Sequence, residues 1–308
     1  MAWGRTEMRM RLLVGGLWIG IGAAVLSADS PTAAKEMAPA PGSNEESSWS
    51  PDGKEMAFDS NRADGKNYNV YILNVAANGI RRLTTSAAND ITPAWSPDGR
   101  LLAFTSDRTG HNEIYLMKAD GSDVRQLTHD GSDDIHPGWT PDGAGVIYCS
   151  ARNNPNQATA PEGERYEIYE VKVSGGEPRQ ITSLGGINTF PVYSPDGKEI
   201  AFRRVLGERN SEVWLMDRDG KNPRNLTNHP AFDGWPAWSP DGKRILFASN
   251  RGGADYNVYV MQRDGSSVQQ LTDLKGRCTS PKWCPDGTRF TFDHAANGRC
   301  AVLLQAMR

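Results

Sequence analysis

The sequence predicts an all-β fold, a six-bladed β-propeller built from four-stranded antiparallel blades. The first reason is a turn motif that occurs six times: an aromatic residue, then Ser, Thr or Cys, then Pro-Asp-Gly. The second is the spacing of these motifs, 46, 44, 54, 45 and 45 residues, because a period in the forties with strand-like segments is typical of propeller blades. The third is the 32 Gly and 19 Pro among 308 residues, which indicate many turns. The motifs begin at Trp49, Trp95, Trp139, Tyr193, Trp238 and Trp283.

One copy, residues 236–272, shows how each blade is expected to form. The residues that end at Trp238 form the innermost strand, and Ser-Pro-Asp-Gly then reverses the chain, because Pro presets its φ and Gly supplies a positive one. The second strand is apolar on both sides, as expected where neighbouring blades cover both faces of a sheet. A third apolar strand follows, and an Asp-Gly turn leads to a more polar outer strand. The expected strands are 236–238, 244–248, 257–261 and 269–272.

The two ends of the chain are expected to meet in the last blade. A Leu-Thr or Ile-Thr pair ends the outer strand of five copies, always 11 residues before the next aromatic residue. The last copy stops at its third strand, residues 301–306. Counting back 11 residues from Trp49 reaches Ala38, with Met37 in the place of Leu or Ile. We therefore expect residues 33–38 to supply the missing outer strand and close the ring.

Residues 1–28 are expected to form a secretory signal peptide, and residues 29–308 the propeller. Three Arg precede an apolar run at residues 12–26 that ends in small residues, which is the pattern of a cleaved export signal. An uncleaved anchor is the alternative, although spanning a membrane usually takes about 20 apolar residues. After cleavage 31 basic and 36 acidic residues remain, so the charge gives no reason to expect nucleic-acid binding. We expect no membrane span in the mature chain.

The repeated pattern resembles a known family. Pro-x-Trp-Ser-Pro-Asp-Gly-Lys, followed by Ile-Ala-Phe-x-Ser-x-Arg, Ile-Tyr-x-Met, Asp-Gly and Leu-Thr, is similar to the WD-like β-propeller repeat of the TolB family, over nearly all of the chain after residue 28. The resemblance implies a six-bladed propeller of the bacterial periplasm that binds a cell-envelope protein. The chain departs from the Tol translocation protein, which carries an α/β domain before its propeller. Here about 20 residues separate the expected signal from the first motif.

Acidic and basic residues recur together at fixed places in the copies. Three copies have Asp five residues before the aromatic residue, and each also has Arg four residues after the aromatic residue of its second strand. Both positions are expected on one face of the disc. We interpret them as ion pairs that hold loops, and the alternative is a ring of carboxylates that binds a cation or ligand. The expected pairs are Asp90 with Arg108, Asp134 with Arg152, and Asp233 with Arg251.

The last copy has cysteines near these positions. Cys278 takes the place of the Asp, and Cys300 lies just beyond the place of the Arg. We predict a disulfide between them, because both are expected on the same face and export leads to an oxidising compartment. Cys149 and Cys284 are expected to remain thiols, and four free cysteines are the alternative. The spacing does not fit a structural zinc site.

The same face carries the candidate binding residues. The third copy is longer by about nine residues between Ser150 and Tyr166, and this insertion either contacts a partner or is a tolerated surface loop. Trp235 is of most interest because an exposed loop Trp often marks recognition, with packing between blades as the alternative. The candidates are Asp133, His136, Asn188, Phe190 and Trp235, together with Asn153 and Arg165 of the insertion.

No common catalytic motif occurs in the sequence. It contains no G-x-S-x-G elbow, no H-E-x-x-H and no phosphate-binding glycine loop. We therefore expect a monomeric binding or scaffolding module without catalysis, metal or cofactor. The alternative is a metal-dependent carbohydrate-active or hydrolytic enzyme with its site at the channel mouth, since His129, His136 and His229 fall in inter-blade loops of one face.

Overall fold

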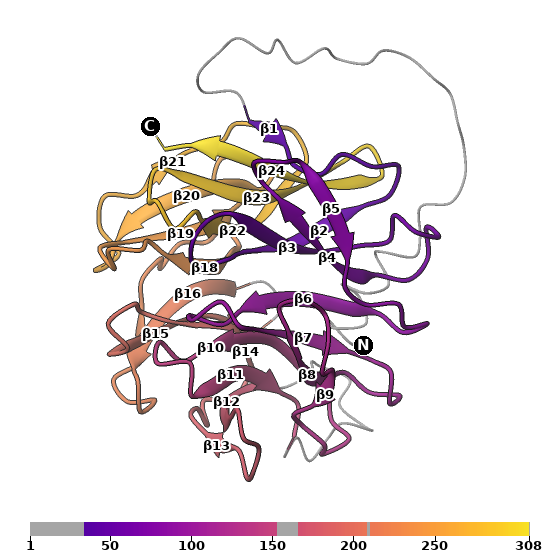
Figure 1. Ribbon diagram of the computed structural model, residues 1–308. Helices are drawn as coiled ribbons and strands as arrows, with labels where there is room; N and C mark the ends of the chain where they lie inside the picture. The colour runs from indigo at the N-terminus through magenta and orange to yellow at the C-terminus, as the bar shows by residue number, and fades with distance from the viewer. Residues whose placement is uncertain (1–33, 153–165, 208–209, 308) are drawn as a thin grey trace.

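The computed structural model describes residues 34–152, 166–207 and 210–307, which form six four-stranded antiparallel sheets (Figure 1). In five blades the strand order follows the sequence, and in the last blade the outer strand comes from the other end of the described chain. The predicted all-β, six-bladed fold is confirmed. A search of the described residues finds no helix long and apolar enough to cross a membrane. The expected signal peptide and the candidate residues Asn153 and Arg165 lie outside the described residues.

The strands of each blade run from the innermost to the outermost. Blade 1 has β2 (Asn44–Trp49), β3 (Glu55–Ser60), β4 (Asn69–Asn74) and β5 (Gly79–Arg82). Blade 2 has β6 (Asp90–Trp95), β7 (Leu101–Ser106), β8 (Glu113–Lys118) and β9 (Arg125–Gln126). Blade 3 has β10 (Asp134–Trp139), β11 (Gly145–Ser150), β12 (Glu167–Lys172) and β13 (Arg179–Gln180).

The second half of the ring continues in the same way. Blade 4 has β14 (Ile187–Tyr193), β15 (Glu199–Leu206), β16 (Asn210–Asp217) and β17 (Arg224–Asn225). Blade 5 has β18 (Asp233–Trp238), β19 (Arg244–Ser249), β20 (Asn257–Gln262) and β21 (Gln269–Gln270). Blade 6 has β22 (Arg277–Trp283), β23 (Arg289–Ala296), β24 (Arg299–Ala306) and β1 (Lys35–Glu36).

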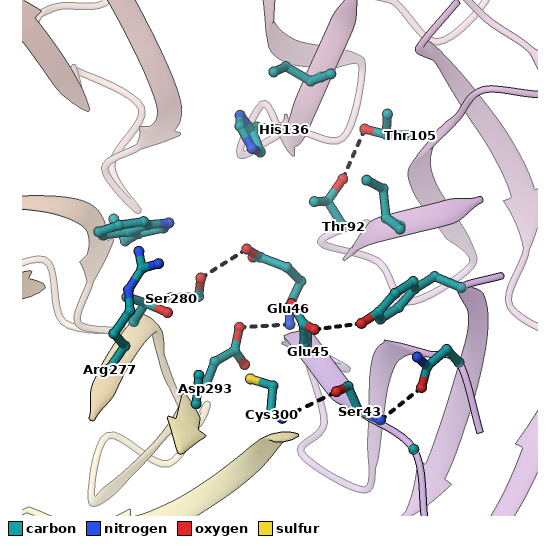
Figure 2. A pocket seen from close by; sticks show the side chains of 18 of the residues that line it. Ser43, Glu45, Glu46, Thr92, Thr105, His136, Arg277, Ser280, Asp293 and Cys300 are labelled. Atoms are coloured by element: carbon teal, nitrogen blue, oxygen red, sulfur yellow. Dashed lines mark hydrogen bonds between the residues drawn. The ribbon is translucent and has the colours of Figure 1, made fainter. Parts of the chain in front are cut away.

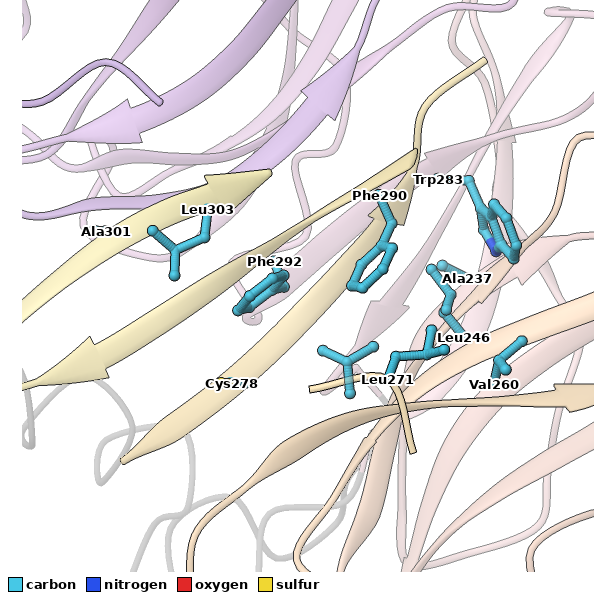
Figure 3. Packing of buried hydrophobic residues seen from close by; sticks show 11 residues of the cluster. Ala237, Leu246, Val260, Leu271, Cys278, Trp283, Phe290, Phe292, Ala301 and Leu303 are labelled. Atoms are coloured by element: carbon cyan, nitrogen blue, oxygen red, sulfur yellow. The ribbon is translucent and has the colours of Figure 1, made fainter. Parts of the chain in front are cut away.

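The core lies between the blades. Six clusters of buried apolar side chains each join two neighbouring blades, so that together they run all the way around the ring. Figure 3 shows the cluster between blades 5 and 6, where Leu246 of β19 packs near Phe290 of β23. Both of these side chains are fully buried, and each such side chain contributes about 2 kcal/mol by leaving water. This explains why the second strands are apolar on both sides.

The repeated motifs make the same backbone contacts in every copy. In the blade 1 turn, the amide of Gly53 donates to the carbonyl of Ser50 at 2.9 Å. The Thr that lies two residues after each of five outer strands accepts a hydrogen bond from a third-strand amide, as Val70 N donates to Thr84 Oγ1 at 3.0 Å. Blades 2 to 5 repeat this bond at 2.8–3.0 Å. The Thr of each Leu-Thr or Ile-Thr pair therefore holds the end of the outer strand against the third strand of its blade.

The predicted closure of the ring is confirmed. Strand β1 pairs antiparallel with β24, with Lys35 opposite Leu304, and the amide of Met37 donates to the carbonyl of Val302 at 2.8 Å. Met37 and Ala38 are only 6% and 2% exposed, and they pack in the cluster between blades 6 and 1. The first described strand thus joins the last blade to the first.

Candidate functional site

Each innermost strand contains a β-bulge three residues before its aromatic residue. The register with the second strand shifts there in all six blades. The bulge residue has a φ of 49–55°, although none of the six is Gly. This conformation is costly for an L-residue and is tolerated where the fold imposes it, and a bulge re-aims the side chain. We call these residues the bulge ring: Glu46, Thr92, His136, Phe190, Trp235 and Ser280.

The bulge ring lines a central cavity of about 900 Å³ (Figure 2). Residues from all six blades line this cavity, so it lies on the axis of the propeller. Its outer part is formed by loops that join second and third strands, including Gly65, Gly110 and Gly298. The cavity therefore belongs to the face on which the sequence placed the candidate binding residues.

One side of the cavity is acidic, and we call it the polar wall: Glu45, Glu46, Thr92, Ser280 and Asp293. Ser280 Oγ donates to Glu46 Oε1 at 2.9 Å, and the amide of Glu46 donates to Asp293 Oδ2 at 3.0 Å. Asp293 is 3% exposed, and its burial, together with the charge of Glu46, raises its pKa well above the usual range for a carboxyl group. Blades 1 and 6 thus meet through a cluster of carboxyl groups at the channel.

The other side is aromatic, and we call it the aromatic wall: His136, Phe190 and Trp235. The rings of His136 and Phe190 stack with centroids 3.8 Å apart, and Phe190 lies 5.5 Å from Trp235. Behind them the guanidinium of Arg203 lies 5.3 Å from the Trp235 ring, in a cation–π arrangement. Blades 3, 4 and 5 therefore each contribute one ring to a row of aromatic side chains that lines the channel.

The structure does not assemble the three histidines into a metal site. His136 lines the cavity, whereas His129 is exposed and His229 uses its Nδ1 to accept the amide of Ala231 at 3.0 Å. Within the described ranges, one group has three possible ligand atoms within 4.8 Å of one another: Glu113, Asp130 and Asp134. Arg152 already bridges two of its members, at 2.6 Å from Asp130 and 3.0 Å from Asp134. This group is therefore an ion-pair network.

The three predicted ion pairs are present in the structure. Arg108 lies 2.8 Å from Asp90, Arg152 lies 3.0 Å from Asp134, and Arg251 lies 2.8 Å from Asp233. Each Asp side chain is fully buried, and each Arg side chain also packs over aromatic rings of its own blade. Burial is strong enough to raise the pKa of Asp134 to about 7 in spite of its Arg partner. These residues hold loops and do not converge on the cavity.

The predicted disulfide between Cys278 and Cys300 is wrong. None of the four cysteines, Cys149 and Cys284 included, forms a disulfide, as in the alternative. Cys278 in β22 pairs with His294, and Cys300 in β24 pairs with Ala295, so β23 lies between the two cysteines. Two strand spacings amount to about 10 Å, beyond the Cα separation of about 7 Å that a disulfide allows.

The other candidate residues divide into two groups. Asp133, His136, Phe190 and Trp235 line the cavity together, whereas Asn188 does not. Asn188 is fully buried and donates its amide to the carbonyl of Tyr166 at 3.1 Å, which is a structural role. Trp235 is not in an exposed loop as expected, because it lies within β18 and is 6% exposed. Trp235 therefore belongs to the aromatic wall of the channel.

Sequence reasoning missed half of the bulge ring. Glu46, Thr92 and Ser280 lie at the same place in their blades as His136, Phe190 and Trp235, three residues before the aromatic residue. That spacing was available in the sequence. The six residues share a position but no common chemistry, so no residue type marks the ring.

Comparisons with known proteins agree with this architecture. The TolB β-propeller domain family matches residues 23–162 and 159–308, and no curated protein matches in sequence. A protein assigned as TolB from Agrobacterium tumefaciens is 26% identical, with a TM-score of 0.68 over 87% of this chain and 91% of its own.

Two further solved structures share the fold. TolB from Acinetobacter baumannii is also 26% identical, with a TM-score of 0.66, and the alignment covers 78% of this chain but 57% of that one. An oligogalacturonate lyase in complex with manganese is similar in fold at 15% identity, with a TM-score of 0.61 over 91% of this chain and 94% of its own. On the match of the family to nearly the whole described chain, this protein belongs to the TolB β-propeller domain family.

Proposed function

We propose that this protein is a non-catalytic binding module of the bacterial periplasm and that a segment of a cell-envelope protein occupies its channel mouth. The observation that carries the proposal is the bulge ring. Six blades that are otherwise alike present six side chains of different chemistry to one cavity of about 900 Å³. A rigid framework that holds varied side chains around one opening loses little conformational entropy on binding.

The similarity to two TolB structures at 26% identity supports the same proposal. Export is supported by the sequence pattern of residues 1–28. The enzyme alternative has less support, because the shared fold with a manganese-bound lyase rests on 15% identity and the three histidines do not meet.

Capture from a solubilised cell envelope tests the binding role. The immobilised protein is compared with Glu46→Gln and His136→Asn, which change the cavity while Asn still tolerates a positive φ. Lys243→Ala, in an exposed turn of blade 5, is the control. We expect one saturable partner to be captured by the wild type and the control, with capture reduced at least tenfold by the cavity variants.

Two results would contradict the proposal. The first is equal capture by the cavity variants, which would place the partner elsewhere. The second is a stoichiometric metal in protein purified without chelators that is lost in His136→Asn, because this would favour a metal-dependent enzyme. Export is tested separately by the N-terminal residue of protein recovered from the periplasmic fraction, which we expect to lie near residue 29.

A further inference from the structure

The charges around the cavity are unequal. Its described lining carries five carboxyl groups and two guanidinium groups. One of the two, Arg299, forms an ion pair with Glu36 of β1 at the rim, and the other, Arg277, lies 5.2 Å from the ring of Tyr256. A channel with an excess of carboxylates and low-dielectric walls attracts cations. The carboxyl groups are Glu45, Glu46, Asp107, Asp133 and Asp293.

Asp293 gives a second and independent indication of a ligand. It lines the cavity and is 3% exposed, and its Oδ2 accepts the amide of Glu46 at 3.0 Å. Its other oxygen, Oδ1, is buried and has no hydrogen-bond partner. A buried carboxylate oxygen without a donor costs free energy, and a ligand that donates to it removes this cost. Burial and the charge of Glu46 raise the pKa of Asp293 well above the usual range for a carboxyl group.

The aromatic wall faces the polar wall across the cavity, so one ligand can touch both. Figure 2 shows His136 on one side and Glu45, Glu46 and Asp293 on the other. Phe190 stacks on His136 and is itself partly exposed. A methylene chain that ends in a charged group fits this combination, because its apolar stem packs on rings while its head remains among carboxylates.

The geometry favours an organic cation over a bare metal ion. In the part of the chain that the structure describes, the polar wall has no group of three His, Cys, Asp or Glu residues with ligand atoms within 4.8 Å of one another. A Ca²⁺ ion takes about 6–8 oxygen ligands, and a compact group of carboxylates is the usual source of several of them. An ammonium group has three donors and a guanidinium group has five, which suits carboxyl groups that are spread over two blades.

We propose that the channel receives the ammonium or guanidinium group of a lysine or arginine side chain, with the charged head at Glu46 and Asp293 and the stem against Phe190. This inference rests on the proposed function in one respect, that the side chain belongs to a segment of a partner protein. The chemistry is the same for a free amine, so the test separates the two sources.

Calorimetric titration of the purified protein provides the test. The probes are a capped pentapeptide Ala-Ala-Lys-Ala-Ala, the same peptide with norleucine in place of Lys, the same peptide with Glu, and cadaverine. We expect the Lys peptide to bind at least tenfold more tightly than the norleucine peptide, and the Glu peptide not to bind. Asp293→Asn and Glu46→Gln are expected to weaken the Lys peptide by roughly tenfold each.

The variants and controls keep the result interpretable. Asn at 293 can still accept the Glu46 amide, so the fold should persist, and thermal unfolding checks this. Asp241→Asn, in a turn of blade 5 that the cavity lining does not include, should leave affinity unchanged. Equal binding of the Lys and norleucine peptides, or unchanged affinity in both cavity variants, would overturn the inference.

Three outcomes separate this inference from the proposed function. Cadaverine that binds tenfold more tightly than the Lys peptide would show a small-amine site and overturn the partner-segment assignment. Capture of an envelope partner without any binding of the Lys peptide at millimolar concentration would overturn the inference that the channel binds a cationic side chain. The proposed binding function would remain supported. Lys-peptide binding without envelope capture would support the charge assignment and count against the proposed function alone.

Discussion

Two positions of each innermost strand, two residues apart, behave very differently. The residue at the first position is fully buried in every blade and does not line the channel. In three blades this residue is an Asp that forms an ion pair with an Arg. The third position is the bulge ring, which faces the channel. The first position varies little, and the third differs in every blade. The first-position residues are Asn44, Asp90, Asp134, Asn188, Asp233 and Cys278.

This difference indicates that the first-position residues stabilise the propeller, whereas the bulge-ring residues form the surface that a ligand contacts. A residue at the first position satisfies buried hydrogen-bonding groups of its own blade, as Asn44 does when its Oδ1 accepts from Arg62 at 2.7 Å. The bulge residues instead line the channel, where Ser280 Oγ donates to Glu46 Oε1 at 2.9 Å, and their strained backbone is imposed by the blade. Substitutions at the first position should therefore lower the free energy of unfolding, and substitutions in the bulge ring should weaken ligand binding.

The largest loss of stability should come from removing the closing strand. A chain that begins at residue 39 lacks the β1 ladder and the buried side chain of Met37. We expect it to lose about 4 kcal/mol of unfolding free energy relative to a chain that begins at residue 34. Chemical denaturation of both chains measures the difference, and equal midpoints would show that ring closure contributes nothing.

The next largest loss of stability should come from substitution of a glycine at a contact between neighbouring blades. A Cβ at Gly220, where φ is +86°, would lie 2.0 Å from the carbonyl oxygen of Ile181. Gly220→Ala should therefore cost about 3 kcal/mol. Gly175→Ala is the matched control, because Gly175 has a φ of +84° with no atom within 4 Å, so it should lose only about 1 kcal/mol. Similar unfolding midpoints for the two variants would mean that blade contact at Gly220 is unimportant.

Breaking one ion pair of the first position should cost about 2 kcal/mol. Arg251→Met keeps much of the side-chain packing but leaves the fully buried Asp233 without its cation. Lys54→Met breaks an exposed pair with Asp52, in which the side chains are 78% and 56% exposed, and should cost less than about 1 kcal/mol. Thermal unfolding at pH 8 compares them, and the expectation fails if the order is reversed.

The smallest effect should be a pH dependence at Asp134. Because burial raises its pKa to about 7, the folded protein binds this proton more tightly than the unfolded chain. The resulting stabilisation is complete below pH 4 and is lost as the pH rises through 7. Asp134→Asn should reduce the fall in stability between pH 6 and pH 8 by about 1 kcal/mol. An unchanged fall would assign the pH dependence to other buried carboxyl groups.

The framework could be predicted because its residues repeat. Six turn motifs and five Leu-Thr pairs gave the blade number and the closing strand, and the Asp and Arg spacing gave the three ion pairs. The cysteine pair failed because a shared face does not reveal that β23 lies between Cys278 and Cys300. Glu46, Thr92 and Ser280 were missed because only the backbone bulge, and no residue type, marks the ring.

The comparison within blade 1 is the most direct test of this account. Asn44→Ala and Glu46→Gln change the first and third positions of one strand, β2, and both are assayed by thermal unfolding and by partner capture per mole of folded protein. We expect Asn44→Ala to lower the melting temperature by several degrees with capture retained, and Glu46→Gln to keep the melting temperature and lose capture. Wild-type binding by Glu46→Gln, or unchanged stability with loss of the partner in Asn44→Ala, would contradict the separate roles of the two positions.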